Sequence, residues 1–144
     1  MRRTDDIERI VTAAHALTRI AALRMQSDVP ATQWRALSVL RAEGPLRVGD
    51  LARRARTTQP GMTRLVHSLV DEGFVTREAD PADSRATIVE ITPSGREAIA
   101  TWLAQLGSAL EPMFTDLDDE DWAALSHAAR ILTARAETLS GVSA

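Results

Sequence analysis

Hydrophobic residues recur at intervals of three and four positions at both ends of the chain. The two sets are Ile7, Ile10, Val11, Ala14, Leu17 and Ala21, and Trp122, Leu125, Ala129, Leu132, Ala136 and Leu139. Because an α-helix has about 3.6 residues per turn, each set lies on one face of a helix. The pattern predicts an amphipathic helix at each end, and Val29-Pro30 ends the first one.

The segment that follows predicts two shorter helices and a brief extended piece. Thr32 is expected to cap a second helix, which stops near residues 43–45. Residues 45–47 form the extended piece, and residues 50–55 form a third helix.

A fourth helix, predicted over residues 59–73, has two contrasting faces. Thr58 can cap it, Pro60 is tolerated in its first turn, and Gly73 can end it in a left-handed conformation. The apolar face is Met62, Leu65, Val66 and Leu69, and the opposite face is Pro60, Thr63, Arg64 and His67. The third and fourth helices, joined by a tight turn, predict a helix-turn-helix, whose second helix can lie in a DNA major groove.

Residues on the exposed face of the fourth helix suit base recognition. Arg64 can donate two hydrogen bonds to guanine O6 and N7, and Thr63 or Gln59 can reach other base edges. Gly61 would let the helix backbone approach DNA closely. Ordinary surface roles stay open for Gln59 and Thr63. Arg64 could instead pair with a carboxylate, and His67 could simply be solvated.

Two short strands are predicted at residues 74–77 and 87–91, directly after the fourth helix. The residues between them, 79–86, form a loop that is too long for a two-residue hairpin turn. The tip of such a hairpin can reach the neighbouring minor groove, whose negative potential favours Arg. Asp83 can hold the guanidinium of Arg85 by a charge-assisted hydrogen bond. We interpret this segment as a wing.

Two more helices complete the predicted order. Thr92-Pro93 begins a fifth helix, and Asp118 can cap a sixth after Glu111-Pro112. The residues of the fifth helix expected to face inward are Ile99, Trp102, Leu103 and Leu106. The fold class is therefore mainly α with a small β-hairpin.

Charge is unevenly distributed, although the net charge is only −3. The segment from Leu46 to Arg77 holds six Arg and three acidic residues, a net charge of +3, and the other 112 residues sum to −6. One basic region with acidic surroundings fits a protein that binds an anionic partner, although a solvated basic helix face would look the same.

Composition excludes several classes of protein. The chain has 144 residues, 44% of them hydrophobic, which suits one domain with its own core. It has no Cys, so it forms neither disulfides nor thiolate zinc sites. No apolar run is long enough to span a bilayer, and the sequence favours a cytoplasmic location without membrane partners. The three His lie on different predicted helices and no catalytic motif is present, so we expect neither enzymatic activity nor a cofactor or metal site.

Residues 44–99 resemble the MarR-type winged helix-turn-helix regulators. The matching motifs are Gly73-Phe74-Val75, Asp80-x-x-Asp83-x-Arg85 and Ile91-Thr92-Pro93-Ser94-Gly95, the last with Ile where the family usually has Leu. The resemblance implies a homodimer in which the first helix and the last two helices of each subunit interlock. Residues 1–30 and 96–144 would then be dimerisation helices within a single domain, 1–144, and residues 31–95 the DNA-binding region.

The resemblance also assigns sites. Contacts to a double-stranded, pseudo-palindromic operator are expected from Arg54, Arg56, Thr58, Gln59, Pro60, Gly61, Thr63, Arg64, His67, Asp83 and Arg85. The dimer interface is expected to include Ile7, Ile10, Leu125, Ala129, Leu132, Ala136 and Leu139. A small aromatic or phenolic effector that relieves repression would contact His15, Arg19, Met25 and Trp34.

Three alternatives stay open at this point. The stripe of the sixth helix could be core within one chain rather than an interface. The regulator could respond to a metal, as some members of the family bind zinc through His and Glu. The chain could also be a dimeric protein-binding module without DNA contact.

Overall fold

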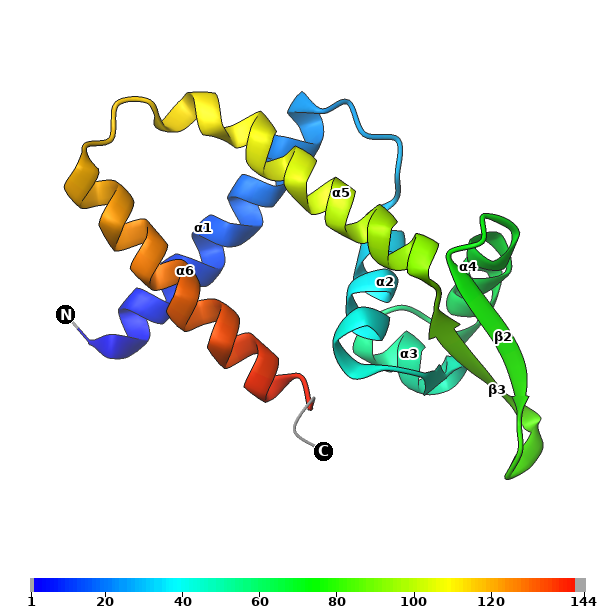
Figure 1. Ribbon diagram of the computed structural model, residues 1–144. Helices are drawn as coiled ribbons and strands as arrows, with labels where there is room; N and C mark the ends of the chain where they lie inside the picture. Colours follow the sequence, from blue (N-terminus) through cyan, green and yellow to red (C-terminus); the bar gives the residue numbers. More distant parts are fainter. Residues whose placement is uncertain (1, 142–144) are drawn as a thin grey trace.

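The computed structural model describes residues 2–141 and is mainly helical, with one small sheet (Figure 1). In chain order the elements are α1 (Arg3–Arg24), α2 (Ala31–Glu43), β1 (Leu46–Arg47), α3 (Val48–Arg54), α4 (Gln59–Asp71), β2 (Val75–Asp80), β3 (Asp83–Ile91), α5 (Pro93–Leu110), the 3-10 helix η1 (Glu111–Phe114) and α6 (Asp119–Leu139). The predicted fold class, mainly α with a small β wing, is confirmed. Within residues 2–141, no helix is both long enough and apolar enough to cross a membrane.

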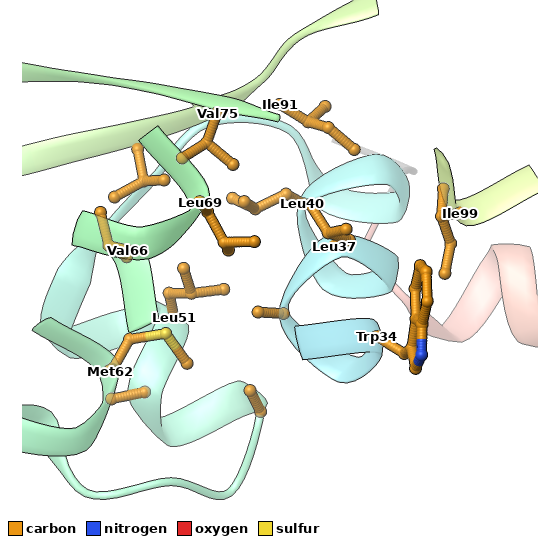
Figure 2. Close-up of a cluster of buried hydrophobic side chains, with 14 residues drawn as sticks. Trp34, Leu37, Leu40, Leu51, Met62, Val66, Leu69, Val75, Ile91 and Ile99 are labelled. Carbon is orange, nitrogen blue, oxygen red and sulfur yellow. The ribbon is translucent and has the colours of Figure 1, made fainter. Parts of the chain in front are cut away.

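The hydrophobic core lies between α2, α3, α4 and the sheet (Figure 2). Leu37 and Leu40 from α2 meet Leu51 from α3 and Leu69 from α4, and all four side chains are fully buried. Ile99 extends the core into α5. Because each short helix places one apolar face into this core, the opposite face of α4 is left to solvent.

The sheet has three antiparallel strands in the order β1-β3-β2. The extended piece predicted before the third helix is β1, and it pairs Leu46 with Val89 and Arg47 with Ile88. The hairpin of β2 and β3 runs from the pair Val75 and Ile91 to the pair Asp80 and Asp83.

Two of the three predicted helix caps, Thr58 and Asp118, are confirmed, and Thr92 caps α5 as well. The side chains of Thr58, Thr92 and Asp118 each accept a hydrogen bond from the backbone N–H three residues later. The prediction for Thr32 is wrong, because α2 begins at Ala31 and Pro30 is its N-cap. The ring of Pro30 holds φ at −61°, so the chain enters the helix without a side-chain cap.

The predicted wing loop is also wrong in length. Both strands extend into residues 79–86, and only Pro81 and Ala82 lie between the strand ends, although Ser84, Arg85 and Ala86 of β3 have no partner on β2. A shift in the pairing register between Ala79 and Asp80 lets this two-residue turn close. Proline presets φ in the turn, and the N–H of Ala82 donates to Asp80 Oδ1 at 2.9 Å.

Two helix boundaries differ from prediction. Helix α1 already ends at Arg24, and Gln26 takes a left-handed φ of 52°, so the residues up to Val29-Pro30 form a loop. Helix α3 starts at Val48, two residues before the predicted Asp50, because Arg47 is its N-cap.

The terminal helices leave apolar faces uncovered in a single chain. Helix α6 has no buried residue, and in Figure 1 it lies away from the winged unit. Ile7 is 63% exposed and Leu139 76% exposed. Leu103, predicted to face inward, is 40% exposed, because α5 packs on α1 and α2 without covering that position. The α6 stripe is therefore not core within one chain, and that alternative is wrong.

Candidate nucleic-acid interface

Helices α3 and α4 and the turn between them form the predicted helix-turn-helix. The turn passes through buried Ala55 and through Arg56, which has a left-handed φ of 55°. Thr57 N–H donates to Ala52 O at 2.8 Å, and Arg35 Nε donates to Ala55 O at 3.0 Å. These bonds fix the angle between α3 and α4, because they tie the turn to both α3 and α2.

The two faces of α4 are as predicted. Met62, Val66 and Leu69 are buried and Leu65 is half-buried. The exposed residues of α4 include Gln59, Pro60, Thr63, Arg64 and His67. The face that is predicted to read bases is therefore exposed to solvent, while the other face packs on the core.

Gly61 has a local structural role that the sequence did not reveal. A Cβ at this position would lie 2.9 Å from Thr58 Oγ1 and 3.2 Å from Thr57 Cγ2. A side chain at this position would therefore crowd the capping side chain of Thr58, whether or not DNA approaches the backbone.

A groove of about 670 Å³ separates the exposed face of α4 from the wing. Gln59 and Thr63 line it from α4, Arg77 from β2, and Arg85 from β3. Arg47, at the start of α3, completes its basic lining. Three guanidinium groups from three elements thus converge beside the recognition face, which suits binding to a polyanion.

Arg85 is held as predicted and remains open to solvent. Its Nε donates to Asp83 Oδ1 at 3.3 Å, and its backbone N–H donates to the same oxygen at 3.1 Å. The Arg85 side chain is 90% exposed. One carboxylate thus orients the guanidinium without covering it.

Arg64 does not pair with Asp71, because His67 faces that carboxylate at 3.7 Å. Among the ion pairs of residues 2–141, none involves Arg64 or Arg77. Both cations are therefore available to a nucleic acid.

Arg54 and Arg56 lie on the approach to α4, as predicted, but do not line the groove beside the wing. Arg54 forms an ion pair with Glu43, and both Arg54 and Arg56 line a cleft against α1 and α2 rather than the groove beside the wing. Arg47 and Arg77, which do line the groove, were absent from the predicted DNA contacts. There was little reason in the sequence to choose them, because the pattern of exposed residues in a short strand does not show which other elements the strand lies against.

Asp80 is the one acidic residue among the buried side chains described, and it lies in the wing. Its Oδ2 is 2.5 Å from Arg47 Nη2. The hydrogen bond from Ala82 N–H and the bond and charge of Arg47 lower the pKa of the Asp80 carboxyl, against the opposing effect of burial. Asp80 is therefore ionised at neutral pH.

A second cleft, of about 930 Å³, lies between α1, α2 and α5. Of the predicted effector contacts, His15, Arg19 and Trp34 line it, whereas Met25 lines an adjoining depression of about 630 Å³. Trp34 stacks on Trp102 with ring centroids 4.5 Å apart, and this pair borders both hollows. In residues 2–141, no three His, Asp or Glu side chains come together as a metal site would require.

Comparison with known proteins finds a family that is similar to the middle of the chain. Residues 27–86 match the model of the MarR family. An uncharacterised HTH-type transcriptional regulator of Mycobacterium leprae is 45% identical over 74 residues, 51% of this chain and 52% of the relative. The multiple antibiotic resistance protein MarR of Salmonella typhimurium is 29% identical over 68 residues, 47% of each chain. The match thus spans about half the length of these curated relatives.

The likeness of fold extends further along the chain. The crystal structure of a transcriptional regulator from Thermotoga maritima superposes with a TM-score of 0.69 at 26% identity, covering 93% of this chain and 96% of that one. The names of these relatives are those of regulators, which supports the expectation that the chain is not an enzyme. The matched residues contain the helix-turn-helix and the wing motif, and in this half of the chain the protein is similar to the MarR family of winged helix-turn-helix regulators.

Proposed function

We propose that the chain acts as a dimeric, sequence-specific DNA-binding regulator of transcription in the cytoplasm. Helix α4 enters a major groove, where Arg64, Thr63 and Gln59 face base edges. The wing lies over the adjacent backbone and minor groove, where Arg85 binds. The observation that carries the proposal is the basic groove between the exposed face of α4 and the wing, with Arg64 free beside it.

A dimer follows from the uncovered apolar faces of the terminal helices. Residues 1–30 and 96–144 serve as dimerisation helices, and residues 31–95 bind DNA. Ile7 and Ile10 on α1 and Leu125, Leu132 and Leu139 on α6 are all exposed in one chain, and a second copy would cover them. Two copies place two α4 helices on one face of a duplex, with half-site centres about one helical turn, roughly 10 base pairs, apart.

A gel shift with the DNA upstream of the chain's own gene tests this proposal, and sedimentation gives the oligomeric state. We expect a dimer that binds a pseudo-palindrome more tightly than a shuffled duplex. A monomer at micromolar concentration would contradict the dimer. Equal affinity for both duplexes would favour a protein-binding module over a sequence-specific regulator.

The cleft between α1, α2 and α5 favours a second function, relief of repression by a small aromatic acid. Its lining includes Arg19, Arg35, Arg54 and Arg56 with His15, and no Asp or Glu. The stacked indoles supply aromatic surface, and the Nε1 atoms of both Trp34 and Trp102 are buried without a hydrogen-bond partner in the described residues. A planar anion with oxygen acceptors suits such a lining.

Indole fluorescence and DNA binding can be measured together in a titration with benzoate, using neutral benzyl alcohol as the matched control. We expect benzoate to quench the fluorescence and weaken DNA binding, and benzyl alcohol to do neither. Arg19→Gln should weaken the benzoate response. A response to divalent metal ions in place of benzoate would favour the metal-responsive alternative.

A further inference from the structure

The wing extends beyond the strand that supports it. Strand β1 pairs with β3 only through Leu46 and Arg47, opposite Val89 and Ile88. From Thr87 to the turn, β2 and β3 pair only with each other, and Figure 1 shows this hairpin reaching away from the helices. An isolated two-stranded hairpin is marginally stable, so the direction of this one depends on a contact near its tip.

The ion pair of Arg47 and Asp80 is that contact. Asp80 ends β2 at the turn and is only 8% exposed, and its Oδ2 lies 2.5 Å from Arg47 Nη2. Its other oxygen, Oδ1, accepts the N–H of Ala82. One carboxylate therefore closes the turn and ties it to Arg47, the N-cap residue of α3.

The same contact leads to Arg85. Asp80 pairs across the hairpin with Asp83, and Asp83 Oδ1 accepts both the backbone N–H and Nε of Arg85. Arg47 and Arg85 line the same groove beside α4. A displacement of Asp80 would therefore move Asp83, and with it the guanidinium that faces the groove.

We propose that Arg47 and Asp80 are positioning residues for DNA binding. Their ion pair holds the wing in the position where Arg85 contacts the duplex. The proposal rests on the DNA-binding function proposed above, and it gives a role to Asp80 and a second role to Arg47. Simple electrostatics predicts that an acidic residue near DNA weakens binding. This proposal predicts the opposite, that Asp80 strengthens it.

The test is Asp80→Asn, with binding measured on a duplex that the wild-type protein selects from a random-sequence pool. Asn keeps a side-chain oxygen for Ala82 N–H and removes only the charge that holds Arg47. Loss of a negative charge should by itself tighten binding to a polyanion. If the ion pair positions the wing, binding should instead weaken by about tenfold, as for loss of a good base contact.

Glu78→Gln is the matched control. Glu78 lies on the same strand, is exposed, and takes part in no ion pair within residues 2–141. This substitution removes the same charge without affecting the Arg47 contact, so its affinity should equal or exceed that of the wild type.

Double-mutant cycles show whether Asp80 acts through the other two residues. In an Arg85→Ala background, Asp80→Asn should cost almost nothing, because the contact it positions is already lost. In an Arg47→Gln background its cost should vanish for the same reason. A purely structural role would leave the effects additive.

The outcomes separate this inference from the function on which it rests. If the wild-type protein selects no duplex, the DNA-binding function fails and the positioning role fails with it. Wild-type binding with unchanged or tighter binding by Asp80→Asn would overturn the positioning role alone. Additive cycles, or loss of helical content measured by circular dichroism in Asp80→Asn, would also overturn it, because the pair would then support the whole fold.

Discussion

The arginines that line the groove beside α4, and Arg64 next to it on α4, differ in which acidic residues hold them. Arg85 is oriented by Asp83 but stays exposed, whereas Arg64 and Arg77 have no acidic partner in the described residues. Arg47 is bound to a buried carboxylate. Because a guanidinium held in place loses less conformational freedom on binding, Arg85 and Arg47 are better prepared for a fixed geometry than the two unpaired residues.

Arg85→Ala tests whether the wing tip contacts DNA. The side chain is exposed and outside the core, so the melting temperature should stay nearly unchanged, while operator binding should weaken by roughly 1–3 kcal/mol. Thermal melting and fluorescence anisotropy measure the two quantities. Arg41→Ala, at the exposed end of α2, is the control for the loss of one positive charge. Unchanged affinity with a lowered melting temperature would rule out the contact.

Arg64→Ala and Arg77→Gln should have different signatures. Arg64 lies on the base-reading face of α4, so its loss should relax preference at one position per half-site and cost about 1–3 kcal/mol. Arg77 lies on the wing side of the groove, so its loss should weaken all sequences alike and reduce the salt slope by about 1. Affinities of variant operators at several salt concentrations measure both. Uniform weakening by Arg64→Ala would assign Arg64 to the phosphate backbone.

At the scale of elements, features that depend on nearby residues in the sequence could be predicted, whereas features that depend on contacts between elements could not. The caps at Thr58, Thr92 and Asp118 could be predicted because a capping side chain bonds its own helix. The two-residue turn could not, because it depends on pairing between β2 and β3 and on the bond from Ala82 to Asp80.

The same distinction separates the features of the candidate site that the sequence predicted from those that it did not. Exposure of Arg64 followed from helix periodicity, and the Arg85 contact from a two-residue spacing. The position of Arg77 in the groove, and of Arg54 in the other cleft, depends on how separate elements pack. No pattern within a single element carries that information.

The junction between the wing and α5 depends on a close contact at Gly95. A Cβ there would lie 2.2 Å from Phe74 O and 2.8 Å from Ile91 Cγ1, so Gly95→Ala must push the helix away from the sheet. We expect a loss of about 2 kcal/mol or more in the free energy of unfolding. Gly107→Ala, in the same helix with nothing within 4 Å of the added methyl, should instead stabilise by about 0.5–1 kcal/mol. Urea unfolding at one protein concentration compares them, and equal effects would contradict the close packing.

At the scale of the whole molecule, the winged unit has a core of its own and the terminal helices do not. The core joins α2, α3, α4, the sheet and the start of α5, whereas α1 buries only Ala21 and α6 buries nothing. Helices with apolar faces in water are unstable unless another surface covers them. In the proposed dimer, a second chain would cover these faces and would also set the spacing of the two α4 helices.

Leu132→Asp should convert the dimer into a monomer. Leu132 lies on the apolar stripe of α6 and is 43% exposed in a single chain, so a charge there would be buried without a partner in the dimer. Ala134→Asp adds the same charge to the opposite face of the same helix and should leave the dimer intact. Sedimentation at micromolar concentration measures the assembly. A monomer can bind only one half-site at a time, so Leu132→Asp should also weaken binding to the full operator by roughly 100-fold while leaving affinity for a single half-site nearly unchanged. If Leu132→Asp stays dimeric and binds the operator normally, the α6 stripe is not the interface and the second copy must lie against another surface of the chain.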